Sequence, residues 1–470
     1  MVGGFVAALY LAGIILAIEA AMKTRTSQGA VAWSVSLVSF PIVAVPAYLV
    51  FGRSKFEGMA EAFEDRRDEF ERLLADIRDE MQPWAIPPAD APSWHAAITR
   101  LSGLPLTRAN RADLLVNGDK TFDSILAGIA AAEHYVLFQF YMIHDDGLGR
   151  RVKDALIDRV RAGVRVYVLY DEIGSGGLPA EYVNELRAAG VEVSSFKPTQ
   201  GFRNRFQLNF RNHRKMVVVD GKVAWVGGHN VGDEYLGLKP GFSPWRDTHV
   251  RLEGPVVQQL QLTILGDWYW AMRETPAANW SPEPASAHDV KAMIFPFGPT
   301  GPFETASLFF VSTLNTARER IWLSAPYFVP DPAVMKALQL AALRGVDVRI
   351  ITTGTPDSWP VFLAAFHYIE ELAGLGIRFY AYKPGFLHEK VMLVDDRLAT
   401  IGTPNFDNRS FRLNFEVTAV IVDENFAREV EAMFEADFAH AETIDPESLK
   451  DRPLWWRVGV KLSRLAAPLL

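Results

Sequence analysis

Two stretches of the chain carry the same set of polar residues at the same spacing. In the first stretch the set is His213, Lys215, Asp220, Gly227 and Asn230. In the second it is His388, Lys390, Asp395, Gly402 and Asn405. The later residues follow each histidine at offsets of 2, 7, 14 and 17, while residues between them differ, such as Arg214 against Glu389. Polar residues kept at fixed offsets while their neighbours change indicate a shared chemical task.

These residue types suit a reaction at a phosphodiester. Lysine and asparagine side chains can hold its non-bridging oxygens, and a pair of histidines can supply a nucleophile and a general acid. The lysines provide the positive charge that a metal would otherwise supply, so we expect no metal and no cofactor. The predicted catalytic residues are His213, Lys215, Asp220, His388, Lys390 and Asp395, and the predicted substrate-binding residues are Asn230 and Asn405. Each aspartate, taken alone, is also a typical turn residue.

The sequence around each set predicts a β-hairpin. A histidine and a lysine two residues apart on a strand point to the same face. The strand continues through 216–219 or 391–394 and turns at Asp220-Gly221 or Asp395-Asp396. The returning strand ends at a glycine-containing loop, which brings the asparagine back beside the histidine and lysine.

The two sets belong to a longer internal repeat. VLFQFYMIHDD around Tyr141 and RAGVRVYVLYD from Arg161 correspond to IWLSAPYFVPD around Tyr327 and LRGVDVRIITTG from Leu343. Strand-like runs alternate with helical runs in both copies, which predicts α/β halves with largely buried sheets. We expect one half at 96–290 and the other at 291–445, packed about a pseudo-two-fold axis with the active site between them.

The amino terminus has two uncharged segments, at 3–18 and 29–52. A bilayer core needs about 20 apolar residues in a helix, so residues 1–52 are predicted to form a two-helix transmembrane hairpin. The alternatives are a signal peptide for the first segment and a buried core helix for the second. The link carries Lys23 and Arg25, and a larger basic group follows residue 52, which favours a cytoplasmic catalytic body.

The remaining segments have simpler patterns. Residues 53–95 predict an amphipathic helix, over 56–81, and a Pro-rich linker. Residues 446–470 form a basic, Trp-rich tail that suits a membrane interface, with a helix docked on the body as the alternative. The chain has 470 residues, a net charge of −8 and no cysteine, which argues against a general nucleic-acid binder and excludes thiolate chemistry.

The doubled HxKxxxxDxxxxxxGxxN pattern resembles the phospholipase D superfamily, and its flanks resemble the bacterial cardiolipin synthases. The matching stretches are RNHRKMVVVDGKVAWVGGHNVGDEYLG, WRDTHVRLEGP, APYFVPD and LHEKVMLVDDRLATIGTPNFDNRSFRLNFE. Pro404 stands where the family more often has a small residue. The resemblance implies an α/β fold of two phospholipase D-like halves in an integral protein of the bacterial inner membrane. It also implies transfer of a phosphatidyl group between two phosphatidylglycerol molecules, which gives cardiolipin and glycerol through a phosphohistidine.

The resemblance also implies roles for single residues. By analogy, His213 attacks phosphorus and His388 acts as acid and base, although pseudo-symmetry makes the reverse plausible. Asp247 and Glu416 are candidates to orient the imidazoles, with surface or ladder carboxylates as the alternative. Two further candidates to support the second site are Asn408 and Arg409, of which Arg409 also suits a role in bracing the fold.

Other functions remain compatible with the same residues. A different phosphatidyltransferase or a phospholipid hydrolase would use the same site with another acceptor. The superfamily also includes nucleases, which the membrane hairpin and the acidic net charge disfavour, and the complete doubled set disfavours an inactive scaffold. The predicted partners are phosphatidylglycerol and anionic membrane lipid, with no nucleic acid, and the pattern carries no signal for oligomeric state.

Overall fold

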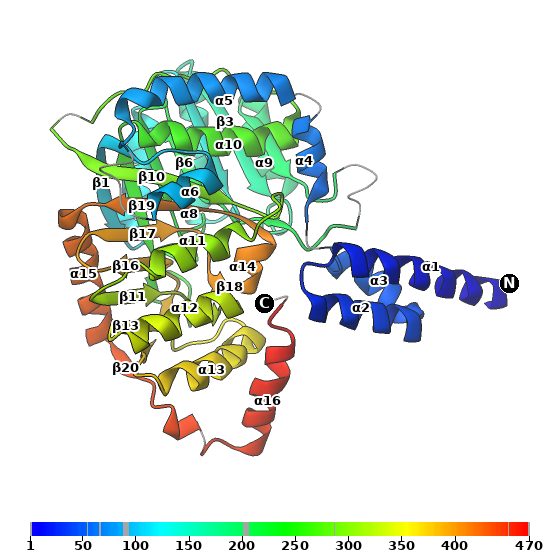
Figure 1. The fold of residues 1–470 in the computed structure, drawn as a ribbon. Helices are drawn as coiled ribbons and strands as arrows, with labels where there is room; N and C mark the ends of the chain where they lie inside the picture. The colour runs from blue at the N-terminus through cyan, green and yellow to red at the C-terminus, as the bar shows by residue number, and fades with distance from the viewer. Residues whose placement is uncertain are drawn as a thin grey trace.

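The structure, a computed structural model, describes residues 2–53, 55–64, 67–87, 94–200, 206–285, 287–449 and 451–468. Residues 88–92 of the predicted Pro-rich linker, and 450 and 469–470 of the predicted tail, lie outside the described residues. Figure 1 shows an α/β body from which three amino-terminal helices project to one side.

One long sheet runs through the body with the strand order β4-β3-β2-β6-β7-β9-β1-β10-β19-β17-β16-β11-β13-β14-β20. The first half contributes β1 (Thr107–Val116), β2 (Tyr135–Phe140), β3 (Arg165–Asp171), β4 (Glu192–Phe196), β6 (Met216–Val219), β7 (Val223–Gly227) and β9 (Thr248–Glu253). The second contributes β10 (Val290–Phe297), β11 (Arg320–Ser324), β13 (Asp347–Thr353), β14 (Arg378–Tyr382), β16 (Val391–Val394), β17 (Leu398–Gly402), β19 (Asn414–Val422) and β20 (Ala441–Thr443). Counted outward from the antiparallel β1–β10 pair, the two halves have the same order, and β20 is an addition.

Helices cover the sheet in the same sequence in both halves. The first half has α7 (Gly118–Ala130), α8 (Gly147–Arg161), α9 (Ala180–Ala188) and α10 (Val256–Met272). The second has α11 (Thr305–Leu314), α12 (Pro332–Leu343), α13 (Trp359–Ala373) and α15 (Glu424–Ala439). The outer strands β2-β3-β4 and β11-β13-β14 are parallel and joined by helical crossovers, and the inner ones, β2 and β11, are the most deeply buried.

The two predicted hairpins are present. β6 pairs with β7, and β16 with β17, both antiparallel. The turns begin at Asp220 and Asp395, each with a φ of 55°, and Gly221 follows Asp220 with a φ of 69°. Positive φ at two successive residues is the backbone of a type I′ hairpin turn.

Three short strands tie the halves together. β5 (Arg211–Asn212) of the first half pairs with β19 of the second. β15 (Phe386–Leu387) of the second half pairs with β8 (Trp245–Arg246) of the first. The segments that directly precede His213 and His388 are therefore each held by the opposite half.

The amino-terminal helices differ from the predicted hairpin. α1 (Val2–Lys23) has the length and composition to cross a membrane, with a mean hydropathy of 1.8 over Val6–Lys23. The second apolar segment is broken into α2 (Ser27–Ser39) and α3 (Pro41–Phe51). A proline has no backbone N–H and disfavours a helical conformation before it, and Phe40 has left the helix, with φ −135° and ψ 56°. Among the described residues, α1 alone is long enough to span a bilayer.

The break also changes where the link between the helices lies. In Figure 1, α1 runs from the distant amino terminus toward the body, and α2 leads away before α3 returns. Arg25, in the link, lies close enough to Glu304 and Arg412 of the body for their charges to act on it. The predicted hairpin placed this link on the far side of the membrane from the body. The structure does not confirm that part of the prediction.

The segment after α3 and the carboxy-terminal segment both dock on the body. The predicted amphipathic helix is present as α4 (Glu57–Glu64) and α5 (Arg67–Met81), and residues 65–66 between them lie outside the described part. Phe56 is fully buried and packs against Phe210, Trp270 and Phe415. The remaining described elements are η1 (Gln82–Trp84), α6 (His95–Ser102), η3 (Asp233–Leu236), β12 (Phe328–Val329), β18 (Phe406–Asp407), α14 (Asn408–Arg412), η4 (Glu447–Leu449) and α16 (Leu454–Leu465).

Candidate active site

The main-chain position of each histidine is set by the opposite half. The backbone N–H of His213 donates to the carbonyl of Phe415 at 2.9 Å, and that of His388 donates to the carbonyl of Arg246 at 2.7 Å. In both cases the carbonyl belongs to the residue just before a buried acid, Glu416 or Asp247. The exchanged short strands therefore bring each imidazole to a carboxylate of the other half.

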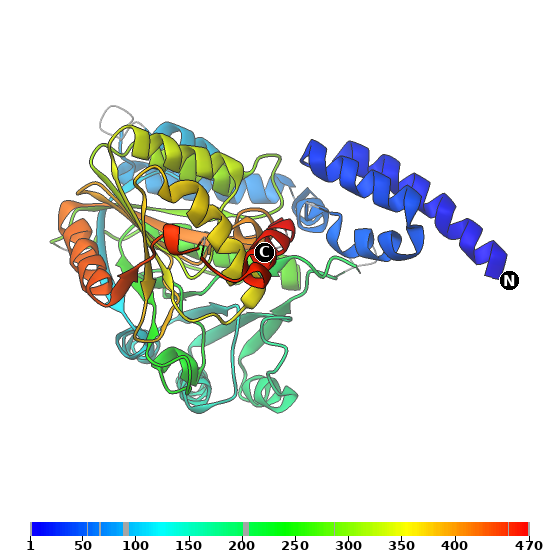
Figure 2. The same ribbon diagram turned by 90° about the horizontal axis from the view of Figure 1, so that it is seen from below.

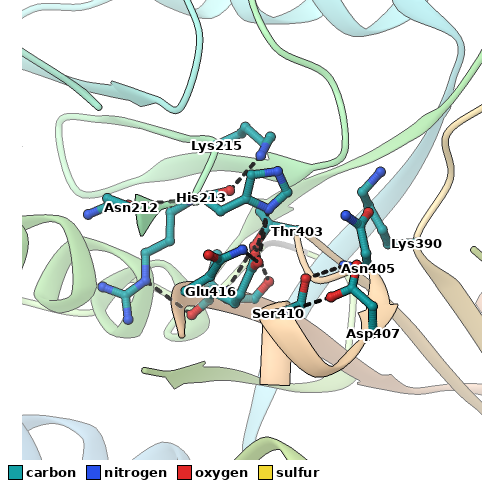
Figure 3. Close-up of polar contacts among 12 residues, drawn as sticks. Asn212, His213, Lys215, Lys390, Thr403, Asn405, Asp407, Ser410 and Glu416 are labelled. Carbon is teal, nitrogen blue, oxygen red and sulfur yellow. Dashed lines mark hydrogen bonds and ion pairs between the residues drawn. The ribbon is translucent and has the colours of Figure 1, made fainter. Parts of the chain in front are cut away.

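Each imidazole is hydrogen-bonded to that carboxylate through Nδ1. His213 Nδ1 lies 2.9 and 3.0 Å from the two oxygens of Glu416, and His388 Nδ1 lies 2.7 Å from Asp247 Oδ2. Glu416 and Asp247 are fully buried, so they can serve no surface role. A carboxylate on Nδ1 places the proton there and leaves Nε2 as the reactive nitrogen. Figure 3 shows this contact for His213.

The two lysines are buried beside the histidines. Lys215 Nζ donates to the carbonyl of His213 at 2.5 Å, and Lys390 Nζ donates to the carbonyl of His388. Figure 3 shows Lys390 and Asn405 on one side of His213 and Lys215 on the other, so residues of both sequence sets gather in one place.

The pKa values of the two histidines show that the charges of both lysines act on each of them. Burial, together with the charges of Lys215 and Lys390, lowers the pKa of His213 to about 4. Burial and the same lysines lower the pKa of His388 to about 3. Both imidazoles are therefore neutral at pH 7, with a free lone pair for attack. A bound phosphodiester anion would offset the lysine charges and raise the imidazole pKa values, which favours protonation of the histidine that acts as acid.

The lysines and carboxylates are perturbed as well. Burial lowers the pKa of Lys390 to about 8 and takes the pKa of Lys215 well below its usual value. Burial alone would raise the pKa of Glu416, but His213 and Lys215 outweigh it, so the pKa of Glu416 lies below its usual value. Asp247 is likewise held ionised, against burial, by the positive groups around it, and its pKa is lowered. Groups this strongly perturbed in one cluster are typical of an active site.

The two asparagines differ in their contacts. Asn230 uses its amide within the fold: Nδ2 donates to the Tyr235 hydroxyl at 2.9 Å, and Oδ1 accepts from the Met142 N–H at 3.2 Å. Asn405 Oδ1 is buried and has no hydrogen-bond partner within the described part of the chain. Asn405 Oδ1 is therefore free to accept a hydrogen bond from a substrate hydroxyl, whereas both ends of the Asn230 amide are already used.

Asp220 and Asp395 lie at the far ends of the hairpin strands, away from the histidines. The Asp220 carboxylate accepts from the backbone N–H groups of Glu133, His134 and Tyr135 at 2.7–2.8 Å. Asp395 accepts from those of Arg318, Glu319 and Arg320 at 2.9–3.2 Å. Six residues lie between each aspartate and its histidine, and seven steps of extended chain span about 20 Å. These contacts support a structural role, and we propose that the two aspartates, predicted as catalytic, anchor the hairpin turns.

This structural role makes a testable prediction. Asp220→Ala leaves three backbone N–H groups without their acceptor, which should cost about 3 kcal/mol of folding free energy. We expect a lower melting temperature in a thermal-unfolding assay, while activity per folded molecule at low temperature stays near that of the wild type. A catalytic aspartate would instead show lost activity in fully folded protein.

The sequence comparison missed several residues that contact the histidines. The ring of Tyr141 lies 4.8 Å from that of His213, and the ring of Trp245 lies 5.1 Å from that of His388. Thr403 Oγ1 donates to Glu416 at 2.5 Å, and Asn414 Nδ2 donates to it at 3.0 Å. Comparing the two copies of the repeat could not find these residues, because Tyr141 corresponds to Pro326 and Thr403 to Gly228.

Asn408 and Arg409 brace the surrounding loops. Asn408 Nδ2 donates to the carbonyl of Val329 at 2.9 Å, which joins α14 to β12. Arg409 donates to the side-chain oxygen of Asn209 at 3.1 Å and to its carbonyl at 2.8 Å. Arg409 thus holds a loop of the first half against α14 of the second.

The fold is similar to those of solved structures that share little sequence with the chain. The phosphatidylserine synthase of Haemophilus influenzae Rd KW20 is 14% identical, with a TM-score of 0.60 over 81% of this chain and 100% of that one. The polyphosphate kinase of Porphyromonas gingivalis is 13% identical, with a TM-score of 0.51 over 76% of this chain and 51% of that one. At these identities the similarity concerns the fold alone.

Sequence relatives are much closer. The family model described as "Cardiolipin synthase, PLD-like domain" matches residues 125–240 and 310–438. Cardiolipin synthase A of Pseudomonas fluorescens is 46% identical over 473 residues, covering 100% of this chain and 98% of the relative. Cardiolipin synthase A of Pseudomonas aeruginosa is 45% identical over 463 residues, covering 97% and 94%. The chain therefore belongs to the bacterial cardiolipin synthases of the phospholipase D superfamily.

Proposed function

We propose that the protein is a phosphatidyltransferase that makes cardiolipin and glycerol from two molecules of phosphatidylglycerol. The observation that carries this proposal is one buried cluster that holds two histidines and two lysines, with each imidazole on a carboxylate from the other half. Family membership supplies the substrate class, and the neutral imidazoles supply the nucleophile.

The reaction takes two displacements. In the first, His213 Nε2 attacks the donor phosphorus, a nitrogen–phosphorus bond forms, and the bond to the headgroup glycerol breaks. His388 gives a proton to the departing oxygen. In the second, a hydroxyl of the acceptor lipid attacks the phosphohistidine and loses its proton to His388, while the nitrogen–phosphorus bond breaks. The assignment of the nucleophile to His213 rests on resemblance to the superfamily.

The neighbouring side chains support both displacements. Glu416 holds the Nδ1 proton of His213, so Nε2 faces phosphorus, and Asp247 stabilises His388 when it becomes an imidazolium. Lys215, Lys390 and Asn405 are placed to hold the non-bridging oxygens as negative charge develops on them.

We propose that the protein is anchored in the bacterial inner membrane with its body in the cytoplasm. α1 would cross the bilayer, and the α2–α3 pair would enter from the side of the body without crossing. Basic residues gather at the end of these helices that lies nearer the body, namely Lys23, Arg25, Arg53 and Lys55. Cytoplasmic ends of membrane helices carry such an excess of positive charge.

The helix α16 in the tail has two apolar faces. Trp456 and Val460 are buried, and Trp456 packs against Phe366 of α13. The opposite face exposes Leu454, Trp455, Val458, Leu462 and Leu465. Basic residues at 457, 461 and 464 lie between the two faces. We propose that the tail, residues 446–470, both docks on the body and contacts anionic lipid with its exposed face.

We also propose the remaining division of the chain as the sequence predicts it. A membrane segment occupies 1–52, a connecting segment 53–95, and the two phospholipase D-like halves 96–290 and 291–445. The same strand order in the two halves supports this division.

The test is product analysis with purified protein in detergent and labelled phosphatidylglycerol as the only lipid. We expect cardiolipin and glycerol in equal amounts, and no product from the His213→Ala/His388→Ala double variant. Phosphatidic acid as the main product would instead identify a hydrolase, and cleavage of plasmid DNA would identify a nuclease.

The lysines lead to a further prediction about metals. Because Lys215 and Lys390 supply positive charge at the phosphate, cardiolipin synthesis should be unchanged when EDTA is added. The measurement is the initial rate with and without chelator. Complete loss of activity, restored by one divalent ion, would contradict this account of the site.

A further inference from the structure

The proposed function requires a binding site for a second phosphate, beside the one held by the histidine–lysine cluster. The acceptor phosphatidylglycerol carries a phosphodiester of its own. When its free hydroxyl attacks the phosphohistidine, the two phosphates lie one glycerol bridge apart. A second site for an anion is therefore needed beside the first, at that separation.

Two arginines, one from each half, lie near Tyr141, which packs on His213. The Tyr141 ring packs on His213 at 4.8 Å, and the side chain of Arg211 is within hydrogen-bond reach of the Tyr141 hydroxyl. Arg409 is close enough for its charge to act on both Tyr141 and Arg211. Tyr141 thus links Arg211 to the reacting histidine, with Arg409 close by.

The loop between the arginines holds them near each other. Arg211 donates to the carbonyls of Leu208 and Phe210, and Arg409 donates to Asn209. Two like charges repel, and Arg211 contributes to lowering the pKa of Arg409, after burial. An anion bound between them would relieve this repulsion.

Two buried acids lie near the arginines and are already engaged by the backbone. Asp171 and Asp407 also act on Arg409. Both carboxylates are buried and bound to backbone N–H groups: Asp171 to those of Ile173, Gly174 and Asn212, and Asp407 to that of Ser410. Arg211 and Arg409 themselves are only partly buried.

The surroundings suit a lipid rather than a soluble anion. Phe206 and Leu208, in the same loop, are 42% and 45% exposed. α14, which carries Arg409, lies at the end of the body nearest the amino-terminal helices (Figure 1). Figure 2, which views the body from below, also shows these helices projecting from one side of it.

We propose that Arg211 and Arg409 bind the phosphodiester of the acceptor lipid and so select phosphatidylglycerol over water and free glycerol in the second displacement. Bound there, the acceptor presents its terminal hydroxyl to the phosphohistidine. The oxygen–phosphorus bond forms, the nitrogen–phosphorus bond breaks, and the hydroxyl proton passes to His388. The inference rests on the proposed function.

The test separates the two displacements. With phosphatidyl p-nitrophenol as donor, nitrophenol release reports the first step, and the ratio of cardiolipin to phosphatidic acid reports how the phosphohistidine divides between phosphatidylglycerol and water. Arg211→Gln should keep the nitrophenol burst and lower that ratio by about 10- to 100-fold, since it loses charge-assisted hydrogen bonds to the acceptor. Transfer to free glycerol, which carries no phosphate, should be unchanged.

Two variants serve as matched controls. Arg211→Lys keeps the charge, so its ratio of cardiolipin to phosphatidic acid should fall less than that of Arg211→Gln. Lys197→Gln removes an exposed charge of the same half, which pairs with Glu172, and it should leave the ratio near that of the wild type. An unchanged ratio in Arg211→Gln, or an equal loss of the burst and the ratio, would overturn the inference. Absence of cardiolipin from the wild type would instead overturn the proposed function.

Discussion

His213→Ala should abolish formation of the covalent intermediate with every donor lipid. The variant lacks the Nε2 that bonds to phosphorus, and no neighbouring group replaces it. We expect neither a burst of nitrophenol from phosphatidyl p-nitrophenol nor a lipid adduct by mass spectrometry of the intact protein. The wild type is the positive control, and its adduct should map to the peptide that contains His213.

His388→Ala should separate bond-making from proton transfer. The nucleophile remains, but loss of the general acid and base typically costs about 10²–10⁴-fold. That cost should shrink in the first step for nitrophenol, which leaves without a proton. We expect a burst and a trapped adduct at His213, followed by very slow turnover. An adduct that appears in His213→Ala and maps to His388 would reverse the two roles. Absence of any adduct in the wild type would exclude the covalent mechanism.

Lys390→Met should cause the second large loss of catalytic activity. It removes a buried positive charge that faces the developing charge on phosphorus, and removal of one such group typically costs about 10²–10³-fold in kcat. Lys383→Met is the matched control, because Lys383 lies in the same half, is exposed and pairs with Glu442. Equal activity of the Lys390 and Lys383 variants in a cardiolipin synthesis assay would show that Lys390 lies outside the reaction.

The same lysine predicts an alkaline limit to activity. Its pKa is about 8 because it is buried, so its charge is present below that pH and lost above it. We expect kcat/KM to fall as the pH rises through about 8. Lys390→Arg keeps its charge to much higher pH, so whatever activity it retains should not fall over this range. A fall of kcat/KM at the same pH in that variant would show that another group causes the alkaline limit.

The sequence predicted the parts of the site that depend on local pattern. The hairpins follow from strand runs and turn residues, and the doubled spacing identified the histidines and lysines. Asp247 and Glu416 were found from their flanking motifs, and the structure places both on the imidazoles. The exchange of short strands could not be predicted, because two-residue strands such as β5 and β15 carry no periodicity to read.

Two differences between the predictions and the structure have physical causes that local pattern does not reveal. The spacing of Asp220 and Asp395 is kept for a structural reason, since each carboxylate binds three backbone N–H groups of the neighbouring loop. Hydrophobicity alone made residues 29–52 appear to be one helix. The break at Phe40–Pro41 is stabilised by packing of α2 and α3 on α1, where Leu37 and Tyr48 are buried together with Ala17 and Ala20.

The strand exchange between the halves also bears on how such a protein can arise. A single half would have a histidine without its carboxylate, so an ancestor of one half could work only as a symmetric dimer in which each copy completed the other. Joining two copies in one chain makes that dimer permanent and frees the copies to diverge. Thr403 now corresponds to Gly228 in the other copy. Asn405 Oδ1 has no hydrogen-bond partner among the described residues, whereas the amide of Asn230 is hydrogen-bonded to Tyr235. Fusion thus allows two once-identical catalytic positions to take different tasks in a single reaction.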